Sequence, residues 1–561
     1  MFVVTTAGHV DHGKSTLVHR LTGMWPDRLA EEQRRGLTID LGFAWTTLED
    51  RQIAFVDVPG HERFVGNMLA GVGPVPATMF VVAATEGWMP QSEEHYAALQ
   101  ALGVRHTMVV ISKADLADPG RTIAQVREHI PGVPVVLGTD MAAVRRELMR
   151  LTDRLPAPDP DADVRLWVDR AFTVRGAGTV VTGTLTAGTL RVGDDLEHDG
   201  RRVTVRGLQS LGDDHTEVSA VARVAVNLRG VDRQAIGRGD TVRTPGAWLD
   251  TSEVDVALRR ADTLHEQLVL HVGAAAVPVR VRPLGDAAAR LRLSRPLPLR
   301  LGDTGLLRDP GEHRIAAGVE VLDVRPPALR RRGAARARAA QLATGRVPPP
   351  VCARVTELRA MGFGVDGTRV GEWVVDPAWW DARRDAARHA VQHWSADHDV
   401  AAGMPMETLR QQLELPAVEL VAPLLDGTGL QLAGGRVRRP GEQLPERVDA
   451  AVRQIEARLA DEPFRAPEAD ELSALGLGAK ELAAAVRAGR LVKIADGVVL
   501  GRDVHDRAAA ALAGLAPPFT VAEAKRAWDT TRRVAVPLLE SLDAKRVTRR
   551  NADGTRVLDA H

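Results

Sequence analysis

The sequence predicts a multidomain protein in which an α/β phosphate-loop domain is followed by two small antiparallel β-barrels and then by tandem winged-helix domains. Three observations lead to this order. A glycine-rich loop motif lies near residue 10, short strands rich in valine and threonine with glycine corners begin near residue 160, and turn dipeptides recur about every 60 residues beyond residue 360. At 561 residues the chain is also too long for a single hydrophobic core.

The composition restricts the setting in which the protein works. Its formal net charge is zero, so any contact with nucleic acid must use a local basic patch. A single cysteine, Cys352, excludes an internal disulfide and a cysteine-based zinc site. No apolar run approaches the length of a membrane span, and the first residues lack the pattern of an export signal. We therefore expect a cytoplasmic monomer without membrane contact.

Residues 8–15 match the phosphate-loop pattern G-x-x-x-x-G-K-[ST] and lie between a predicted strand at 2–6 and a predicted helix at 15–21. Glycines let backbone N–H groups approach phosphates, and the helix N-terminus adds its positive end. Lys14 is expected to reach the β- and γ-phosphates, and the hydroxyl of Ser15 to ligate Mg²⁺. The loop residues assigned to the nucleotide site are Gly8, His9, Val10, Asp11, His12, Gly13, Lys14, Ser15 and Thr16.

A candidate first switch follows at residues 35–40, the sequence RGLTID. Thr38 could give its hydroxyl to Mg²⁺ and its backbone to the γ-phosphate, which would order the segment in the triphosphate state. A polar turn is the alternative interpretation of this segment. We expect the side chains of His9, His12 and His19 on the helix surface or in loops.

A second switch is predicted where the apolar strand at 53–56 runs into the turn at 57–62. Asp57 is expected to hold Mg²⁺ through a bound water. The N–H of Gly60 can meet the γ-phosphate because no side chain intervenes, and His61 would orient the attacking water. The catalytic assignment is therefore His61, Gly60, Lys14 and Thr38.

The strand predicted at 108–111 delivers the sequence Ser112-Lys113-Ala114-Asp115. Asp115 can accept both N–H donors of a guanine edge, which adenine does not offer, and the stem of Lys113 would lie along the base plane. Ser112 stands where the usual motif has asparagine. A further base contact near residues 133–139 is only weakly indicated. Four motifs in this order predict a P-loop GTPase domain that binds GTP and Mg²⁺.

A proline-rich joint at residues 155–160 ends this domain, and the barrel signature at 176–183 follows it. Toward the C-terminus, turn dipeptides at 366–367, 434–435, 496–497 and 553–554 lie between strand-like runs and follow apolar helices, as in winged-helix units. The basic stretch at 330–338 could touch RNA, but a solvated helix is the expected interpretation. The predicted domains are residues 1–155, 160–250, 251–325, 326–400, 401–440, 441–505 and 506–561.

The last of these units carries the strongest basic character. Arg532 and Arg533 are expected to begin the recognition helix, and Arg549 and Arg550 to lie on the wing. Together they could track an RNA backbone. A basic face that is merely solvated is the alternative. Trp528 could stack on a base, although core packing is commoner for tryptophan.

The phosphate loop, the two switch segments and the barrel signature together resemble translational GTPases. The short first switch within residues 27–44 resembles that of the bacterial selenocysteine-specific elongation factors, a family that also tolerates a hydroxyl residue at the position of Ser112. The resemblance implies delivery of selenocysteinyl-tRNA to the ribosome at UGA codons, with the terminal winged helices bound to an mRNA hairpin. It implies an aminoacyl pocket of Asp169, Arg170 and Arg223, and mRNA contacts from Arg532, Arg533, Arg549 and Arg550.

Two other functions remain open at this point. A general translational GTPase would handle ordinary aminoacyl-tRNA, but the winged-helix repeat argues against it. An RNA-binding regulator would use GTP only as a ligand, but the presence of Gly60 and His61 argues against that.

Overall fold

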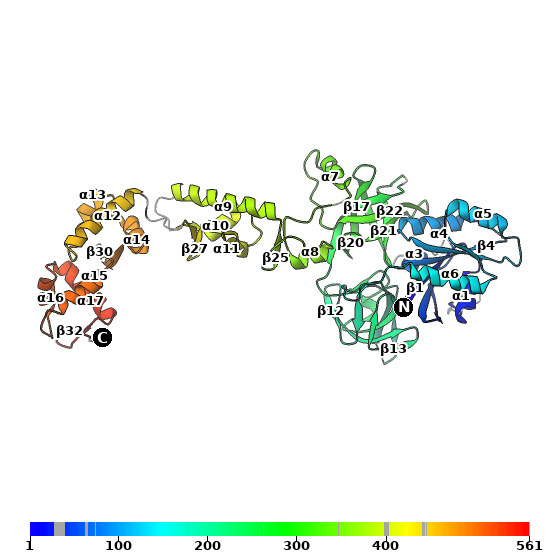
Figure 1. Ribbon diagram of the computed structural model, residues 1–561, viewed down its shortest axis with the longest axis horizontal. Helices are drawn as coiled ribbons and strands as arrows, with labels where there is room; N and C mark the ends of the chain where they lie inside the picture. Colours follow the sequence, from blue (N-terminus) through cyan, green and yellow to red (C-terminus); the bar gives the residue numbers. More distant parts are fainter. Residues whose placement is uncertain are drawn as a thin grey trace. The chain divides into compact units, whose positions relative to one another are not determined.

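The computed structural model describes residues 1–26, 40–61, 65–72, 75–176, 178–261, 263–345, 347–397, 403–439, 444 and 446–559 (Figure 1). Thr38 and most of the candidate first switch therefore lie outside the described residues. The chain forms two compact units, Met1–Asp366 and Gly367–His561. Among the helices described, none combines the length and apolar character needed to cross a membrane.

The N-terminal domain is a six-stranded sheet in the order β2-β3-β1-β4-β5-β6. Only β2 is antiparallel to its neighbour. Every residue of the central strand β4 is buried, as expected for a parallel strand covered on both faces. The strands are β1 Phe2–Ala7, β2 Gly42–Leu48, β3 Arg51–Asp57, β4 Ala77–Ala83, β5 His106–Ser112 and β6 Val135–Leu137. The predicted α/β architecture of the N-terminal domain is confirmed.

Helices cover both faces of this sheet. α1 (Lys14–Thr22) and α6 (Met141–Asp153) pack their apolar side chains into the core on one face. The other face is covered by α3 (Val65–Val72), α4 (Pro90–Ala101) and α5 (Gly120–His129). Because β1, β3 and β5 are parallel, the loops that follow them emerge at the same edge, where α/β proteins bind ligands.

The next domain is an eight-stranded antiparallel sheet that curls on itself. A Cβ atom on Gly183 in β9 would lie 2.4 Å from the carbonyl oxygen of Trp167 in β7, so glycine is required where these strands meet. The strands are β7 Arg165–Trp167, β8 Arg170–Val174, β9 Gly178–Leu185, β11 Asp195–His198, β12 Arg201–Ser210, β13 Asp213–His215, β15 Ala222–Arg229 and β16 Thr241–Arg243. A separate pair is formed by β10 Thr189–Arg191 and β14 Glu217–Ser219.

A closed six-stranded barrel follows, in the order β17-β20-β19-β18-β21-β22. Its strands are β17 Leu249–Arg259, β18 Gln267–Val272, β19 Ala275–Pro283, β20 Ala288–Leu299, β21 Thr304–Asp309 and β22 Arg314–Asp323. Side chains along β19 alternate between buried and exposed, which is the pattern of a small filled barrel. The predicted β-barrel architecture is thus confirmed.

Helix α7 (Ala334–Leu342) lies in the basic stretch for which the sequence predicts a solvated helix. That interpretation is wrong for Arg338, which is only 4% exposed. Its Nε donates to Asp255 of β17 at 2.7 Å, and a second nitrogen bonds Asp323. Leu342 packs with Leu284 and other barrel residues, so α7 is docked by one face. A short helix, α8 (Val355–Met361), follows within the same unit.

The second unit alternates helices with short hairpins. Predicted turns at Gly434-Gly435, Asp496-Gly497 and Asp553-Gly554 are confirmed, because they connect β27–β28, β29–β30 and β31–β32. The remaining turn is wrong. Hairpin β24–β25 pairs Val370 with Trp373 and turns at Gly371-Glu372, whereas Asp366-Gly367 precedes β24. These hairpins are β24 Thr368–Val370 and β25 Trp373–Val375, β27 Gln431–Ala433 and β28 Arg436–Arg438, β29 Leu491–Ala495 and β30 Val498–Gly501, and β31 Thr548–Arg550 and β32 Arg556–Leu558.

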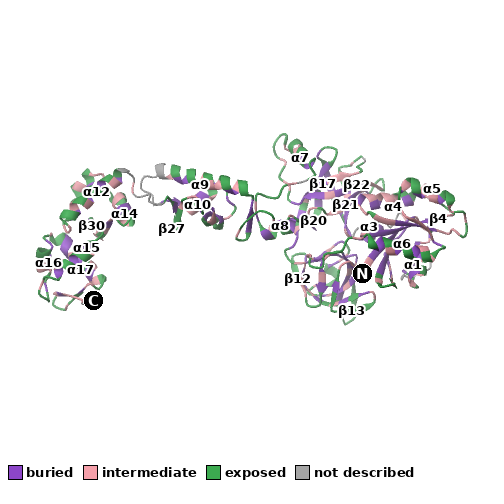
Figure 2. Cartoon of the chain, in the orientation of Figure 1, coloured by how far each residue is buried: buried purple, intermediate pink, exposed green. Residues whose placement is uncertain are grey.

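One apolar cluster extends through residues 448–542 and includes side chains from both sides of residue 505. Figure 2 colours the buried residues of the chain purple. Trp528 is 2% exposed within this cluster, and its Nε1 donates to the carbonyl of Ala508, so it packs in the core instead of offering a stacking surface.

The helices of this unit are α9 Pro377–Asp397, α10 Met406–Gln412, α11 Val421–Leu424, α12 Glu446–Asp461, α13 Ala469–Ala474, α14 Ala479–Arg487, α15 Val504–Leu512, α16 Val521–Ala527 and α17 Arg532–Ala544.

Candidate nucleotide-binding and aminoacyl sites

The predicted phosphate loop connects β1 to α1 at the carboxyl edge of the sheet. Gly8 has φ +126°, and a Cβ there would lie 2.1 Å from the carbonyl oxygen of Val81. Gly13 has φ +79° directly before α1. Only glycine meets both requirements without strain. The two glycines of the motif are therefore explained by backbone geometry.

Lys14 lies inside the loop and is 6% exposed. Its Nζ donates to the carbonyl oxygens of Gly8 at 3.0 Å and His9 at 2.8 Å. Gly60 reaches the same place from the loop after β3, since an added Cβ would lie 2.5 Å from Lys14 Nζ and 2.7 Å from the backbone nitrogen of Val10. The structure thus brings Lys14 and Gly60 together across 46 positions of sequence.

His61 follows Gly60 and lies beside the phosphate loop. Burial is the main cause that lowers the pKa of His9, and the neighbouring charges of Lys14 and His61 act in the same direction against Glu86 and Asp11. Since His61 influences the pKa of His9, it lies close to the loop, where a residue that orients a water would have to be.

Ser15 and Asp57 form the candidate metal site. Ser15 Oγ donates to Asp57 Oδ2 at 2.7 Å, and Thr6 Oγ1 donates to Asp57 Oδ1 at 2.5 Å. Asp57 is fully buried, and Thr6 Oγ1 also accepts from the N–H of Val58 at 3.1 Å. Oxygen ligands next to a phosphate loop suit Mg²⁺, so these residues fit the ion. The sequence analysis did not predict this role for Thr6, although a polar residue within the mostly apolar strand β1 could have indicated it.

The predicted base motif lies beside the phosphate loop. Ser112 Oγ donates to the carbonyl of His12 at 2.6 Å, which ties the two segments together. Lys113 has φ +53°, and its Nζ donates to Glu86 Oε1 at 3.1 Å. Asp115 is exposed in the turn that follows. A Cβ on Gly138 would lie 3.5 Å from Ser112 Cα, so the weakly indicated fifth segment also lies next to this motif.

Two buried histidines, His12 and His95, pack at the phosphate loop. His12 lies in the loop between β1 and α1, as predicted, but its side chain is not at the surface: it is fully buried, with Nδ1 at 3.3 Å from the carbonyl oxygen of Val81. Burial lowers the pKa of His12 to about 4. His95 of α4 is 2% exposed, and burial lowers its pKa to about 3. The Nδ1 of this neutral ring accepts the N–H of Gly8 at 3.1 Å. No local motif marks His95, because it comes 87 positions after Gly8.

The second domain contributes a buried ion pair. The guanidinium of Arg223 on β15 bonds both carboxylate oxygens of Asp169, with Nη2 at 2.7 Å from Oδ1. Thr182 Oγ1 also donates to Asp169 at 2.7 Å. Arg223 Cζ lies 4.0 Å from the ring centroid of Phe43, which belongs to β2 of the first domain. Asp169 and Arg223 therefore meet at the junction of two domains.

Arg170 takes a different direction from the other predicted pocket residues. Its Nε donates to Asp40 Oδ2 at 3.0 Å, and its Nη2 donates to the carbonyl of Leu41 at 2.6 Å. Arg238, which the sequence did not indicate, also donates to Asp40. In this conformation Arg170 is engaged by the first domain instead of joining the Asp169–Arg223 pair.

The four predicted RNA-contact arginines lie at the expected elements. Arg532 begins α17, and Arg549 and Arg550 lie on β31. Arg533 pairs with Glu468 at 3.0 Å, and Arg549 with Asp559 at 3.4 Å. Among the other basic residues of this domain, Arg556 is 4% exposed and pairs with Asp543, so it is unsuited to contact RNA.

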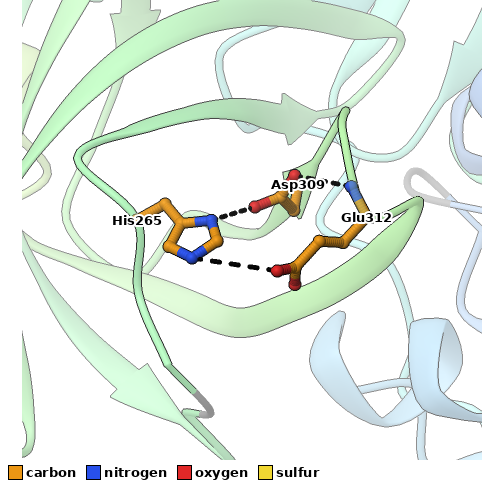
Figure 3. Close-up of side chains that lie close together, drawn as sticks. All are labelled: His265, Asp309 and Glu312. Carbon is orange, nitrogen blue, oxygen red and sulfur yellow. Dashed lines mark hydrogen bonds and ion pairs between the residues drawn. The ribbon is translucent and has the colours of Figure 1, made fainter.

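A further polar cluster joins His265, Asp309 and Glu312 on the closed barrel (Figure 3). The two ring nitrogens of His265 face different carboxylates, Nδ1 at 2.6 Å from Asp309 and Nε2 at 3.8 Å from Glu312. Arg314 also pairs with Glu312. Asp309 also accepts the backbone N–H groups of Gly311 and Glu312, so this cluster stabilises the turn between β21 and β22.

The sheet order, the phosphate loop with its buried aspartate, and the following β-barrels define a translational GTPase. Three family models match the chain: the elongation factor Tu GTP binding domain over residues 1–272, the β-barrel domain of selenocysteine-specific elongation factor over 251–328, and the winged helix of elongation factor SelB over 510–558. The chain belongs to the elongation factor Tu family of translational GTPases, in its selenocysteine-specific, or SelB, branch.

Individual relatives agree with this assignment. The chain is 38% identical over 345 residues to the selenocysteine-specific elongation factor of Escherichia coli, covering 58% of this chain but only 56% of that protein. It is 35% identical over 281 residues to elongation factor Tu 2 of Streptomyces avermitilis, covering 44% of this chain and 72% of that protein. The crystal structure of a bacterial selenocysteine-specific elongation factor has the same fold, with a TM-score of 0.76 at 22% identity over 100% of both chains.

Proposed function

We propose that this protein is a GTP-dependent elongation factor that delivers selenocysteinyl-tRNA to the ribosome at UGA codons while its C-terminal winged-helix domains hold an mRNA hairpin. The observation that carries the proposal is the Asp169–Arg223 pair, which faces Phe43 where the nucleotide domain meets the first barrel domain. A pocket at this junction can respond to the nucleotide and contact a cargo at the same time.

The nucleotide site would bind GTP through the phosphate loop and through Ser112, Lys113 and Asp115. Mg²⁺, when bound, would neutralise phosphate charge, held by Ser15 and Thr38 and through water by Asp57. The 2.7 Å hydrogen bond between Ser15 and Asp57 supports this set, because it brings their oxygens to one place.

Hydrolysis would depend on Gly60 and His61. His61 would orient the attacking water once the ribosome docks, with Lys14 and the N–H of Gly60 directed at the γ-phosphate. The proposal predicts that His61→Ala keeps GTP and tRNA affinity but loses ribosome-stimulated turnover, measured as phosphate release with and without ribosomes. Unchanged stimulated turnover would remove His61 from the mechanism.

Charge provides a physical basis for selecting selenocysteine. Around the proposed pocket, Arg170, Arg223 and Arg238 face Asp40 and Asp169, which leaves one positive charge in excess among these five side chains. A thiol has a pKa of about 8.5 and a selenol is more acidic, so the cargo would be an anion at neutral pH, whereas the serine of the precursor tRNA is neutral.

The pocket is tested by comparing the affinity for selenocysteinyl-tRNA with that for seryl-tRNA. Wild-type protein should prefer the former, and Arg223→Gln should reduce the preference by at least about tenfold, since a charge-assisted bond contributes about 1.5–3 kcal/mol. Arg229→Gln, on the same strand β15 and exposed, is the matched control. Equal affinity of the wild-type protein for both tRNAs would favour a general translational GTPase.

The C-terminal arginines would tether the factor to its message, which raises its effective concentration at one codon. Replacing both Arg549 and Arg550 by Gln in the full chain should weaken binding to an RNA hairpin from a gene with an in-frame UGA, and should make the slope of log K against log salt shallower by about 1 to 2. Arg388→Gln on α9, where Arg388 pairs with Asp385, is the control. An unchanged salt slope would exclude the wing from the RNA interface.

A further inference from the structure

A single side chain, Arg238, joins both domains at three points. Its Nε donates to the backbone carbonyl of Asp169 at 2.9 Å, within its own domain. Its Nη2 donates to Asp40 Oδ1 at 2.6 Å, and its Nη1 bonds the side-chain oxygen of Asn67. The planar fork of arginine allows one residue to make these three contacts together.

Each contacted residue belongs to a segment with a distinct proposed role. Asp40 is the last residue of the candidate first switch and directly precedes Leu41 and β2. Asn67 lies on α3, the helix that follows the candidate second switch. Asp169 is the acidic residue of the aminoacyl pocket and holds Arg223. Arg238 therefore lies where the two switch regions and the pocket converge.

The bond to Asp40 is strengthened by charge. Two guanidiniums share this carboxylate, Arg170 at 3.0 Å and Arg238 at 2.6 Å. Burial disfavours ionisation of Asp40, but the hydrogen bond from Arg238 and the charges of Arg170 and Arg238 outweigh it, so the pKa of Asp40 lies below its ordinary value. Asp40 is thus ionised at neutral pH, and its bonds to both arginines are charge-assisted.

We propose that Arg238 is a positioning residue that transmits the nucleotide state to the aminoacyl pocket, by holding Asp40 and Asn67 against the backbone of Asp169. A change in either switch that moves Asp40 or Asn67 displaces the Arg238 fork and the segment at Asp169. The same displacement of Asp40 also determines whether the Arg170 side chain keeps its hydrogen bond to Asp40 or reorients toward the Asp169–Arg223 pair. This inference rests on the proposed function, and it adds the physical connection between its two sites.

The consequence is a coupling free energy between nucleotide and cargo. If this coupling depends on Arg238, removal of its guanidinium lowers the ratio of the aminoacyl-tRNA affinities in the GTP and GDP states. By reciprocity, the effect of the tRNA on nucleotide affinity falls by the same factor. Couplings of this kind span about 5- to 150-fold, so a loss of about tenfold or more is expected.

The first test needs no tRNA. Hydrogen exchange of peptides covering residues 165–174 is measured with GDP and with a non-hydrolysable GTP analogue. In the wild-type protein, protection should differ between the two nucleotides. In Arg238→Gln the difference should vanish, while affinity for both nucleotides stays within about twofold. Arg229→Gln should keep the wild-type difference. Protection that is independent of nucleotide in the wild-type protein, or unaltered by Arg238→Gln, would overturn the proposal.

The second test uses the cargo. Arg238→Gln should weaken selenocysteinyl-tRNA binding in the GTP state much more than in the GDP state. Arg238→Lys keeps the charge but not the fork, so it should not restore the ratio. Asp40→Asn should lower the ratio as well, and the double variant should lose no more than the larger single loss. An equal loss in both nucleotide states would instead mean that Arg238 contacts the tRNA directly, which contradicts the proposed role.

These results also separate the inference from the proposed function. If nucleotide-dependent exchange at residues 165–174 disappears in Arg238→Gln but the wild-type protein binds no selenocysteinyl-tRNA, the coupling stands and the proposed cargo is wrong. If the wild-type protein prefers selenocysteinyl-tRNA in the GTP state and Arg238→Gln leaves that preference intact, the function stands and Arg238 is not its connection.

Discussion

Ser15 and Asp57, 42 positions apart in the sequence, meet through a hydrogen bond of 2.7 Å between Ser15 Oγ and Asp57 Oδ2. Ser15 lies in the first turn of α1 and Asp57 ends β3, so the contact joins the phosphate loop to the second switch. Because Thr6 Oγ1 donates to the other oxygen of Asp57, both oxygens of the carboxylate have a defined orientation.

Ser15→Ala should remove one oxygen from the proposed Mg²⁺ site and leave the loop backbone intact. We expect GTP affinity measured in Mg²⁺ to fall by at least about tenfold, because a lost metal contact costs on the order of 1.4 kcal/mol or more. In EDTA, wild-type protein and variant should bind GTP alike. Thr47→Ala, at an exposed position of β2 outside the nucleotide site, is the control. An equal loss in Mg²⁺ and in EDTA would show that Ser15 serves the fold and not the ion.

Asp115→Asn should abolish the preference for guanine. The carboxylate can accept two N–H groups, whereas the amide has one acceptor and presents a donor, which leaves one guanine N–H unpaired. We expect GTP affinity to fall about 100-fold, as for the loss of about 3 kcal/mol in charge-assisted bonding. Competition by GTP, ATP and XTP against a fluorescent nucleotide measures this. Asp118→Asn, exposed in the same loop, should leave the order of affinities unchanged.

His95→Gln should flatten the dependence of stability on acid pH. Burial lowers the folded-state pKa of His95 to about 3, well below the ordinary 6.5. Protons therefore bind the unfolded state preferentially. The contribution of neutral His95 to the free energy of unfolding is fully present above pH 6.5 and is lost as the pH falls toward 3. Between pH 7 and pH 5, protonation of this single group in the unfolded state should lower the free energy of unfolding of the wild-type protein by about 2 kcal/mol.

The measurement is the urea midpoint at which β1 peptides lose exchange protection, at pH 7 and at pH 5. The shift between the two pH values should be smaller in His95→Gln than in the wild-type protein. His129→Gln, a partly exposed histidine on α5, is the control and should keep the wild-type shift. Equal shifts in the wild-type protein and His95→Gln would mean that His95 is not held neutral by the fold.

Arg338→Met should destabilise the closed barrel. Arg338 is 4% exposed and bonds Asp255 and Asp323, which are themselves buried. Removing one partner of a buried ion pair leaves uncompensated charge and typically costs about 3–5 kcal/mol. Arg336→Met, exposed on the same helix, should change stability by less than about 0.5 kcal/mol. Urea unfolding followed by exchange in β17 and β22 peptides compares the two, and similar midpoints would contradict a structural role for Arg338.

Features that depend on neighbouring residues were predictable from the sequence. The strand and helix around the phosphate loop lie within β1 and α1, and the glycine positions match backbone requirements at Gly8 and Gly13. Three of four hairpin turns were also right, since a tight turn needs its own residues to adopt unusual φ angles. The turn at Gly371 was missed because an Asp-Gly pair four residues earlier offered a stronger signal.

Side-chain partners that lie far apart in the sequence could not be read in this way. The resemblance implies that Arg170 belongs to the aminoacyl pocket, whereas its side chain bonds Asp40, 130 positions away. The sequence predicts a solvated helix at Arg338, whereas this side chain lies in a buried network. The charge of an arginine is evident from sequence, whereas the carboxylate that it meets depends on how domains pack.

Periodicity, glycine positions and short motifs, all effects of adjacent residues on one backbone, were sufficient to identify the family, the architecture and the main nucleotide-site candidates. Packing alone decided that His95 holds Gly8, that Thr6 orients Asp57, and that Arg238 joins Asp40 to Asp169. The reason is that hydrogen bonds and burial act over a few ångströms in space, and only folding brings distant residues within that range.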